Sequence, residues 1–186
     1  MANFIHSHAL VETDTIGEDT RIWAFVHILK NVSIGSNCNI CDHCFIESGV
    51  SIGNNVTIKS GIYIWEGATI ENDVFLGPNV VFTNDNRPRS KQYVEANPIL
   101  VKEGASIGAN STILAGVTVG KYAMSGIGSV ITRNVPDHAL VYGNPAIVRA
   151  WVDKKGRKLI QQSESDHWIS EDQEIFKLTE NGMIQL

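Results

Sequence analysis

The chain has 186 residues, of which 43% are hydrophobic and 19% charged, and its formal net charge is −5 at pH 7. These proportions are typical of a globular protein that buries a sizeable core. The negative charge argues against nucleic acid or an anionic membrane as a partner, because both require a basic face. No apolar run approaches the roughly 18 residues of a membrane span, and the first ten residues lack the pattern of a secretion signal. We therefore expect a cytoplasmic protein.

A six-residue period of apolar residues begins at Ile16 and continues without a slip to Phe82. The phase breaks for thirteen residues, resumes at Val101 and runs to Ile131, with one lapse at Ser125. Neither a helix with 3.6 residues per turn nor a heptad produces this period. Repeats this short are typical of a β-solenoid, in which each unit buries its apolar face by stacking on its neighbours.

A second column of residues follows the first at an offset of three. It consists of Gly, Asn or Asp except at Phe25, His43 and Tyr122. These three residue types tolerate positive φ, so the column predicts a tight corner after each short strand. The period by itself fixes neither the number of sides of the solenoid nor its hand.

The repeated I-G-x-x-V-x units resemble those of the hexapeptide-repeat acyltransferases. That resemblance implies an all-β fold, a left-handed parallel β-helix of about six triangular coils, each made of three hexapeptide units. It implies that residues 1–150 form the β-helix domain, with a protruding loop at residues 83–100. Residues 151–186 are expected to form a small extension of two hairpins, which turn at Lys154 to Arg157 and at Asn181-Gly182.

A coil of three hexapeptide units places Glu66 directly beneath Asn84, at the corner from which the loop leaves. A polar loop inserted into an unbroken repeat indicates function. A carboxylate and an amide on neighbouring coils suit a hydroxyl or amine ligand, so we expect both residues to bind substrate and take part in catalysis. The alternative is that they are solvated corner residues.

The loop itself carries Asp85, Arg87 and Arg89, which we expect to contact substrate. Arginine commonly pairs with phosphate groups, so the two arginines suit a diphosphate. A solvated loop tip is the alternative reading of the same charges.

Two glycines, Gly108 and Gly126, are one full coil apart in the sequence, and Asn144 follows at the same interval. Two glycines in one column predict a bare backbone groove that a narrow ligand can approach. Residues 135–146 resemble the V-P-x-x-x-L-V-x-G-x-P-A terminator of hexapeptide acetyltransferases. The resemblance implies a homotrimer that holds coenzyme A between two subunits. It assigns pantetheine contacts to the two glycines and a cofactor contact to Asn144, while Arg149 either pairs with a phosphate or is a plain surface residue.

The three cysteines Cys38, Cys41 and Cys44 have a spacing that suggests a metal site. The repeat argues against it, because Cys38 and Cys44 fall in the inward column on successive sides of the coil and Cys41 points outward. The γ-class carbonic anhydrases share this solenoid but need three zinc histidines, and that pattern is missing here. We therefore expect no metal.

The loop contains no histidine, the residue that many O-acetyltransferases of this family carry there. A hydroxyl acceptor needs a general base, whereas a sugar amine with a conjugate-acid pKa near 8 is partly free at pH 7. The sequence therefore favours N-acetylation over O-acetylation, with the amine attacking the thioester directly.

The blocks W-E-G (65–67), G-P-N-V-V-F-T-N-D (77–85) and P-R-S (88–90) resemble the nucleotide-sugar 3-amino N-acetyltransferases. The resemblance implies acetyl-CoA as donor and a dTDP-3-amino-3,6-dideoxyhexose as acceptor, for bacterial surface glycans such as the O-antigen of lipopolysaccharide. The alternatives are a UDP-2-acetamido-3-amino-glucuronate N-acetyltransferase, a sugar O-acetyltransferase and a non-enzymatic β-solenoid scaffold.

Overall fold

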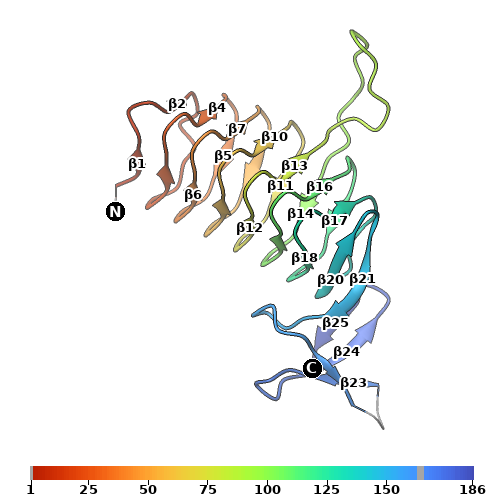
Figure 1. The fold of residues 1–186 in the computed structure, drawn as a ribbon. Helices are drawn as coiled ribbons and strands as arrows, with labels where there is room; N and C mark the ends of the chain where they lie inside the picture. Colours follow the sequence, from red (N-terminus) through yellow and green to blue (C-terminus); the bar gives the residue numbers. More distant parts are fainter. Residues whose placement is uncertain (1, 163–165) are drawn as a thin grey trace.

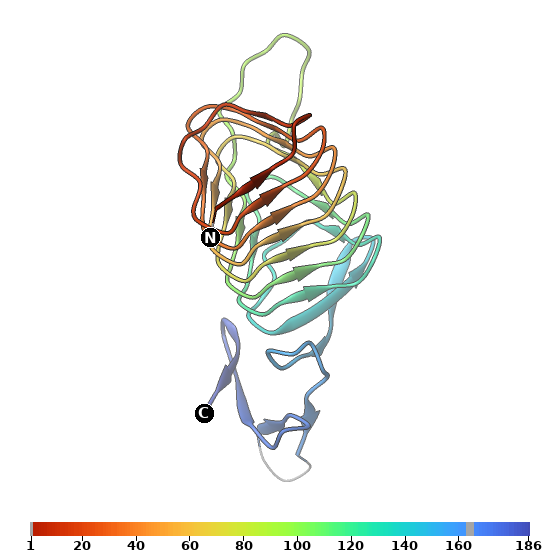
Figure 2. The ribbon, with the colours of Figure 1, turned by 90° about the vertical axis from the view of Figure 1, so that its left-hand side faces the viewer.

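A computed structural model describes residues 2–162 and 166–186. The chain winds into a three-sided parallel β-solenoid with a loop that projects from its side, and a small antiparallel sheet follows the last coil (Figure 1). Viewed from the N-terminal end, the coils follow one another as similar turns, each displaced from the one before it (Figure 2). Within the described residues there is no helix, and hence none suited to cross a bilayer.

Each side of the solenoid is one sheet, which we name A, B and C in the order in which the chain visits them. Sheet A contains β1 (Phe4–Ile5), β3 (Arg21–Ile22), β6 (Asn39–Ile40), β9 (Thr57–Ile58), β12 (Phe75–Leu76), β15 (Ser106–Ile107), β18 (Met124–Ser125), β20 (Ala139–Gly143) and β21 (Ala146–Trp151). Sheet B contains β2 (Leu10–Val11), β4 (His27–Ile28), β7 (Phe45–Ile46), β10 (Tyr63–Ile64), β13 (Val81–Phe82), β16 (Thr112–Ile113) and β19 (Val130–Ile131). Sheet C contains β5 (Ser33–Ile34), β8 (Ser51–Ile52), β11 (Thr69–Ile70), β14 (Leu100–Val101) and β17 (Thr118–Val119).

The register confirms a coil of three hexapeptide units. Phe45 pairs with Tyr63, and Tyr63 pairs with Val81, each three hexapeptides further on. Val81 then pairs with Thr112, so the interruption adds thirteen residues to one coil. In the described chain sheet A has eight parallel strands and sheet B seven, so the solenoid has more turns than the six expected. The additional turns come from residues before Ile16 and after Ile131, where the apolar period is absent.

The inward column forms one continuous core. Ile22, Ile40, Ile58 and Leu76 stack along sheet A and are fully buried. The second inward column contributes smaller residues, which include Cys38 and Cys44. Both thiols donate to backbone carbonyl groups of the next coil, and burial raises the pKa of the Cys44 thiol to about 11. Their predicted role as small core residues is confirmed.

The corners adopt positive φ as predicted, and they do so even where the column departs from Gly, Asn and Asp. Phe25, His43 and Tyr122 have φ of 59°, 61° and 52°. An L-residue in this region costs roughly 1–2 kcal/mol. The ring of Phe25 stacks between those of His8 and His43 at centroid distances of 5.4 and 5.0 Å, which offsets part of that cost.

The C-terminal extension has the two predicted hairpin turns. Val152 pairs with Lys158 across the first, and the second connects two strands of sheet D. Sheet D contains β22 (Ile160–Gln161), β23 (His167–Ile169), β24 (Ile175–Thr179) and β25 (Gly182–Gln185). The second turn contacts the solenoid, because the Asp137 N–H donates to the Asn181 carbonyl (2.9 Å) and the Met183 N–H donates to the Asp137 carbonyl (3.1 Å).

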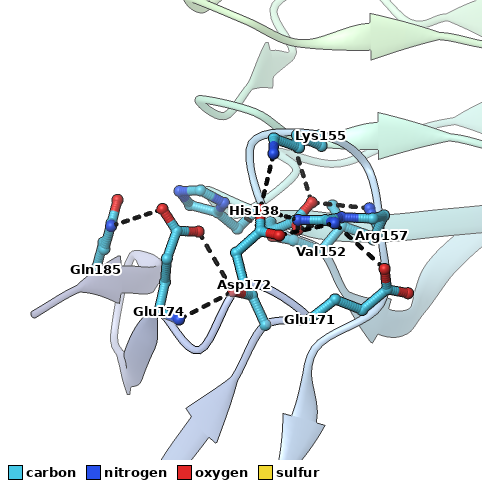
Figure 3. Close-up of polar contacts among 10 residues, drawn as sticks. His138, Val152, Lys155, Arg157, Glu171, Asp172, Glu174 and Gln185 are labelled. Atoms are coloured by element: carbon cyan, nitrogen blue, oxygen red, sulfur yellow. Dashed lines mark hydrogen bonds and ion pairs between the residues drawn. The ribbon is translucent and has the colours of Figure 1, made fainter.

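A cluster of charges holds the extension together (Figure 3). Arg157 forms ion pairs with the buried carboxylate of Asp153 (2.7 Å) and with Asp172, to which Lys155 also donates (2.8 Å). These cations hold the pKa of the Asp172 carboxyl well below its usual range. The carboxylates of Asp153, Asp172 and Glu174 lie within 4.8 Å of one another, but Arg157 and Lys155 already neutralise two of them, so we interpret the cluster as structural.

His138 joins this extension to the last coil and provides a pH-dependent contact. The ring is buried between those of Tyr122 and Phe176, at centroid distances of 5.1 and 5.3 Å, and its Nδ1 lies 2.9 Å from the Val152 carbonyl (Figure 3). Burial lowers the pKa of His138, although the hydrogen bond to the Val152 carbonyl and the nearby carboxylates of Asp137 and Asp153 oppose that shift.

We expect the melting temperature to fall as the pH is lowered through the ordinary His value of about 6.5. Below that pH the unfolded chain binds a proton that the folded chain resists, so the folded state loses stability. The measurement is calorimetry between pH 7.5 and 5.5 on the wild type and on His138→Asn, since Asn also tolerates the positive φ at this position. The variant should show a shallower pH slope. An identical slope in both proteins would contradict the assignment to His138.

Candidate active site

The loop leaves the solenoid at the corner between sheets B and C, where β13 ends. Thr83, the first loop residue, is fixed to the next coil: its hydroxyl donates to the Ile113 carbonyl (3.1 Å) and accepts from the Ala115 N–H (2.8 Å). The Asn86 side-chain amide donates to the Ala115 carbonyl (3.3 Å). The first residues of the loop are thus held on the solenoid, while the loop tip extends away from it (Figure 1).

The returning end of the loop is inserted into the corner ladder. The Asn97 N–H donates to the Asn84 carbonyl (3.0 Å), and the Gly116 N–H donates to the Asn97 carbonyl (3.3 Å). Asn97 therefore lies between two corners that would otherwise stack directly. The Asn84 carbonyl therefore pairs with the returning loop, and Asn97 separates this corner from the corner at Gly116.

Glu66 and Asn84 occupy neighbouring coils of this corner, which we call the acceptor corner. The Tyr63–Val81 pairing sets their register. Trp65 is half-buried, and its Nε1–H donates to the Phe82 carbonyl (2.8 Å). Glu66 is exposed and Asn84 half-buried, and in the described chain their side chains form no hydrogen bond to each other. The placement agrees with the spacing argument; the substrate-binding and catalytic roles remain predictions.

The sequence assigned no role to Glu47, which positions the backbone of this corner. Its Oε2 accepts a hydrogen bond from the Glu66 N–H (2.8 Å). Glu71 makes the same contact with the Glu103 N–H (2.9 Å) at another corner. The recurrence indicates that a carboxylate at this position supports the corner of the next coil. Glu66 itself is exposed.

Of the loop residues expected to contact substrate, Asp85 directly follows Asn84, whereas Arg87 and Arg89 lie further along the loop. The Asp85 carboxylate accepts from the Arg87 N–H (2.6 Å), which forms a local turn. Arg87 and Arg89 are exposed, and the Arg89 guanidinium donates to the Pro88 carbonyl within the loop (2.8 Å). The loop that carries both arginines projects from the side of the solenoid (Figure 1).

Steric contacts between the last coils explain why glycine occupies both positions of the expected donor groove. A Cβ on Gly108 would lie 2.7 Å from the backbone of Gly126, and one on Gly126 would lie 2.8 Å from the Tyr142 Cβ. Close stacking of the last coils therefore requires glycine at both positions, whether or not a ligand binds. The missing side chains do not by themselves indicate a groove, and a coenzyme A contact there remains a prediction that rests on the resemblance.

Asn144 and Arg149 lie on the β20–β21 hairpin, which closes the solenoid. Asn144 is exposed at the turn. The Arg149 guanidinium carbon is 5.3 Å from the centroid of the Tyr142 ring, a cation–π arrangement that orients the side chain. Arg149 is exposed and so remains open to an anion such as a phosphate.

The expected donor and acceptor residues lie on different corners of the triangle. Gly108 and Gly126 follow strands of sheet A, so they lie at the corner between sheets A and B. Glu66 and Asn84 follow strands of sheet B, so they lie at the corner between sheets B and C. The width of sheet B separates the two groups, and one chain does not bring them together.

Comparison with known families and structures agrees with the solenoid geometry. The family model described as "Bacterial transferase hexapeptide (six repeats)" matches residues 15–48 and 49–84. The model described as "Hexapeptide repeat of succinyl-transferase" matches residues 98–133. The interval between these matches lies within the loop.

A relative from Aneurinibacillus thermoaerophilus, a dTDP-3-amino-3,6-dideoxy-α-D-galactopyranose 3-N-acetyltransferase, is 64% identical over 157 residues. The match covers 84% of this chain and 82% of that protein. It is long enough to include the solenoid, the loop and the acceptor corner together.

Two solved structures share the fold. The acetyltransferase domain of PglB from Neisseria gonorrhoeae FA1090, in complex with acetyl coenzyme A, is 18% identical with a TM-score of 0.54; the match covers 79% of this chain and 57% of that one. A hexapeptide transferase family protein from Anaplasma phagocytophilum is 17% identical with a TM-score of 0.56, covering 83% and 81%. The all-β, left-handed parallel β-helix predicted from the sequence is thus the fold of this chain.

Proposed function

Since the chain belongs to the bacterial hexapeptide-repeat transferases, we propose that it is an N-acetyltransferase that moves an acetyl group from acetyl-CoA to the 3-amino group of a dTDP-3-amino-3,6-dideoxyhexose. The observation that carries the proposal is the 64% identity to the Aneurinibacillus enzyme over 84% of this chain. The acceptor corner supports it, because a carboxylate and an amide lie on neighbouring coils where the loop begins. The product serves bacterial surface glycans such as the O-antigen of lipopolysaccharide, and the enzyme acts in the cytoplasm.

The reaction is a direct acyl transfer. The free amine attacks the thioester carbon, the new C–N bond forms, the C–S bond breaks, and the departing thiolate takes the surplus proton from nitrogen. Glu66 accepts a hydrogen bond from the amine and Asn84 fixes the sugar, so that the enzyme contributes mainly by orientation. A strong general base is unnecessary, because roughly a tenth of an amine with a conjugate-acid pKa near 8 is free at pH 7.

The complete site belongs to a homotrimer in this proposal. The corner of Gly108 and Gly126 on one subunit faces the acceptor corner of its neighbour, so that coenzyme A and the sugar meet between two chains. The separation of these corners across sheet B supports this arrangement. The loop supports it too, because it projects from the side of the solenoid, where a second chain can contact it (Figure 1).

The test is a panel of nucleotide amino sugars assayed with acetyl-CoA by thiol release. We expect turnover with dTDP-3-amino-3,6-dideoxyhexoses and little with the corresponding 3-hydroxy sugars. The kcat/KM should rise about tenfold from pH 6 to pH 7, because the free amine fraction rises in that proportion below its pKa. Turnover confined to UDP-2-acetamido-3-amino-glucuronate would favour that alternative, and no thiol release with any amino sugar would overturn the proposed function.

A further inference from the structure

The outer face of sheet B, together with the corner that precedes it, forms an aromatic recess. Its volume is about 360 Å³, within the range of small-molecule sites. It is lined by Phe25, His27, His43, Cys44, Phe45, Tyr63 and Trp65. On the same outward positions sheet C carries Ser33, Ser51 and Thr69. The repeat itself therefore does not require aromatic side chains at these positions.

The rings of the recess form an ordered array. His27, Phe45 and Tyr63 follow one another on successive coils in edge-to-face contacts, with centroid distances of 5.5 and 6.2 Å. Tyr63 and Trp65 are also edge-to-face, at 6.1 Å. Phe25 and His43 stack nearly parallel at one rim, with an angle of 16° between the rings. Such rigid faces and edges suit a flat aromatic ligand, since ring pairs prefer stacked or edge-to-face geometry.

The recess is continuous with the acceptor corner. A second hollow, lined by Gly61, Tyr63, Trp65, Val80, Val81 and Phe82, shares Tyr63 and Trp65 with it. Trp65 directly precedes Glu66, and its hydrogen bond to Phe82 fixes the indole at the edge where the loop begins. A ligand with its ring in the recess can therefore extend along this edge to Glu66 and Asn84.

One polar group in the recess is already oriented. The Nε2 of His27 lies 2.8 Å from the Glu12 carboxylate. When that nitrogen carries the proton, the lone pair of the neutral ring is on Nδ1. In that tautomer Nδ1 can accept a hydrogen bond from an imide N–H, which thymine and uracil have and cytosine lacks.

We infer that the aromatic recess binds the pyrimidine base of the sugar nucleotide, with the base packed against Tyr63 and Phe45 and read by His27. This inference rests on the proposed function, because it extends the acceptor site from the amino sugar to the nucleotide. The diphosphate lies between the two ends of the ligand, where the loop arginines of a neighbouring chain reach it.

The test uses dTDP alone as the probe, so that it does not depend on acetyl transfer. Tyr63 is 53% exposed, so Tyr63→Ala should fold normally. Isothermal calorimetry should show that this variant binds dTDP at least tenfold more weakly than the wild type, the loss typical of one stacking contact to a base. In turnover assays, the KM of this variant for the acceptor should rise, while its kcat should stay within about twofold of the wild-type value. The matched control is Phe75→Ala on sheet A, 39% exposed and outside the recess, which should bind dTDP as the wild type does.

A second variant tests how the base is read. The wild type should bind dTDP more tightly than dCDP, and His27→Phe, which keeps a ring but removes the acceptor nitrogen, should lose that preference. If His27→Phe retains the preference, the role of His27 is wrong.

The failure of this inference is distinguishable from failure of the proposed function. Unchanged dTDP binding by Tyr63→Ala, or no dTDP binding by the wild type, would overturn the base site even where acetyl transfer is observed. Conversely, recess-dependent dTDP binding without acetylation of any amino sugar would overturn the proposed function alone. The alternative occupant of the recess is a second copy of this chain, and sedimentation velocity tests it. If Tyr63→Ala dissociates the assembly but retains the wild-type affinity for dTDP, a second copy covers the recess and the inference fails.

Discussion

Replacement of Ile58 by aspartate is expected to prevent folding. Ile58 is fully buried in β9, where it stacks between Ile40 below and Leu76 above. The substitution removes an apolar side chain whose burial contributes about 1.5–3 kcal/mol. It also places a carboxylate among aliphatic groups with no partner, which adds several kcal/mol for the charged form. The sum is comparable with the roughly 5–15 kcal/mol by which domains are stable.

The matched control is Thr57→Asp at the adjacent outward position of the same strand. Thr57 pairs with Asn39 and Phe75 on the outer face of sheet A, where water reaches the side chain. Circular dichroism and thermal unfolding should give a native-like transition for the control and none for Ile58→Asp. A cooperative transition within a few degrees of wild type in Ile58→Asp would show that the inward column does not carry the core.

The comparison of these two neighbours shows why most of the fold was predictable. In a coil of three equal hexapeptide units a single period sets strand, face and register together, so the assignment of Ile58 as inward and Thr57 as outward follows from position. The terminal coils lack this period, so their strands and register could not be predicted from it. The last coil lacks the period after Ile131 and is completed by β20, which pairs with β18 and is covered by its own hairpin partner β21.

The candidate site was predictable only in part. Glu66 and Asn84 emerged from the spacing, because they differ by one full coil. The support from Glu47 depends on a side chain reaching a backbone N–H on the next coil, which the spacing does not encode. The separation of the donor and acceptor corners could have been predicted from the spacing. Once the thirteen-residue insertion is subtracted, the interval from Glu66 to Gly108 is not a whole number of coils.

The aromatic recess illustrates a different limit. Phe25 and His43 depart from the Gly, Asn and Asp column, and this irregularity was the available signal. What the residues do together depends on ring orientation across three coils, and neither period nor composition determines that orientation. Such deviations from a strict repeat are informative, because the fold does not require an aromatic side chain at these corner positions.

Substitutions at the acceptor corner are expected to produce the largest loss of activity without loss of fold. Glu66→Gln keeps the shape of the side chain but removes the charge that accepts a hydrogen bond from the amine. Hydrogen bonds to charged groups contribute about 1.5–3 kcal/mol, so kcat/KM for the amino sugar should fall by roughly 10- to 100-fold. Asn84→Ala should cause a loss of the same order, because the sugar is no longer held against the thioester. The KM for acetyl-CoA should change little in either variant.

The control is Glu103→Gln, which removes a carboxylate from a corner between sheets C and A. Its ion pair with Lys121 (3.1 Å) is largely exposed, so the loss should be small for both stability and turnover. All three variants should unfold at temperatures within a few degrees of wild type, since none of these side chains is buried. Wild-type kcat/KM in Glu66→Gln or Asn84→Ala would remove that residue from the site. Glu66→Gln and Glu103→Gln remove the same charge at different corners. An equal loss of kcat/KM in both would show that the loss comes from the change in net charge and not from the position of Glu66.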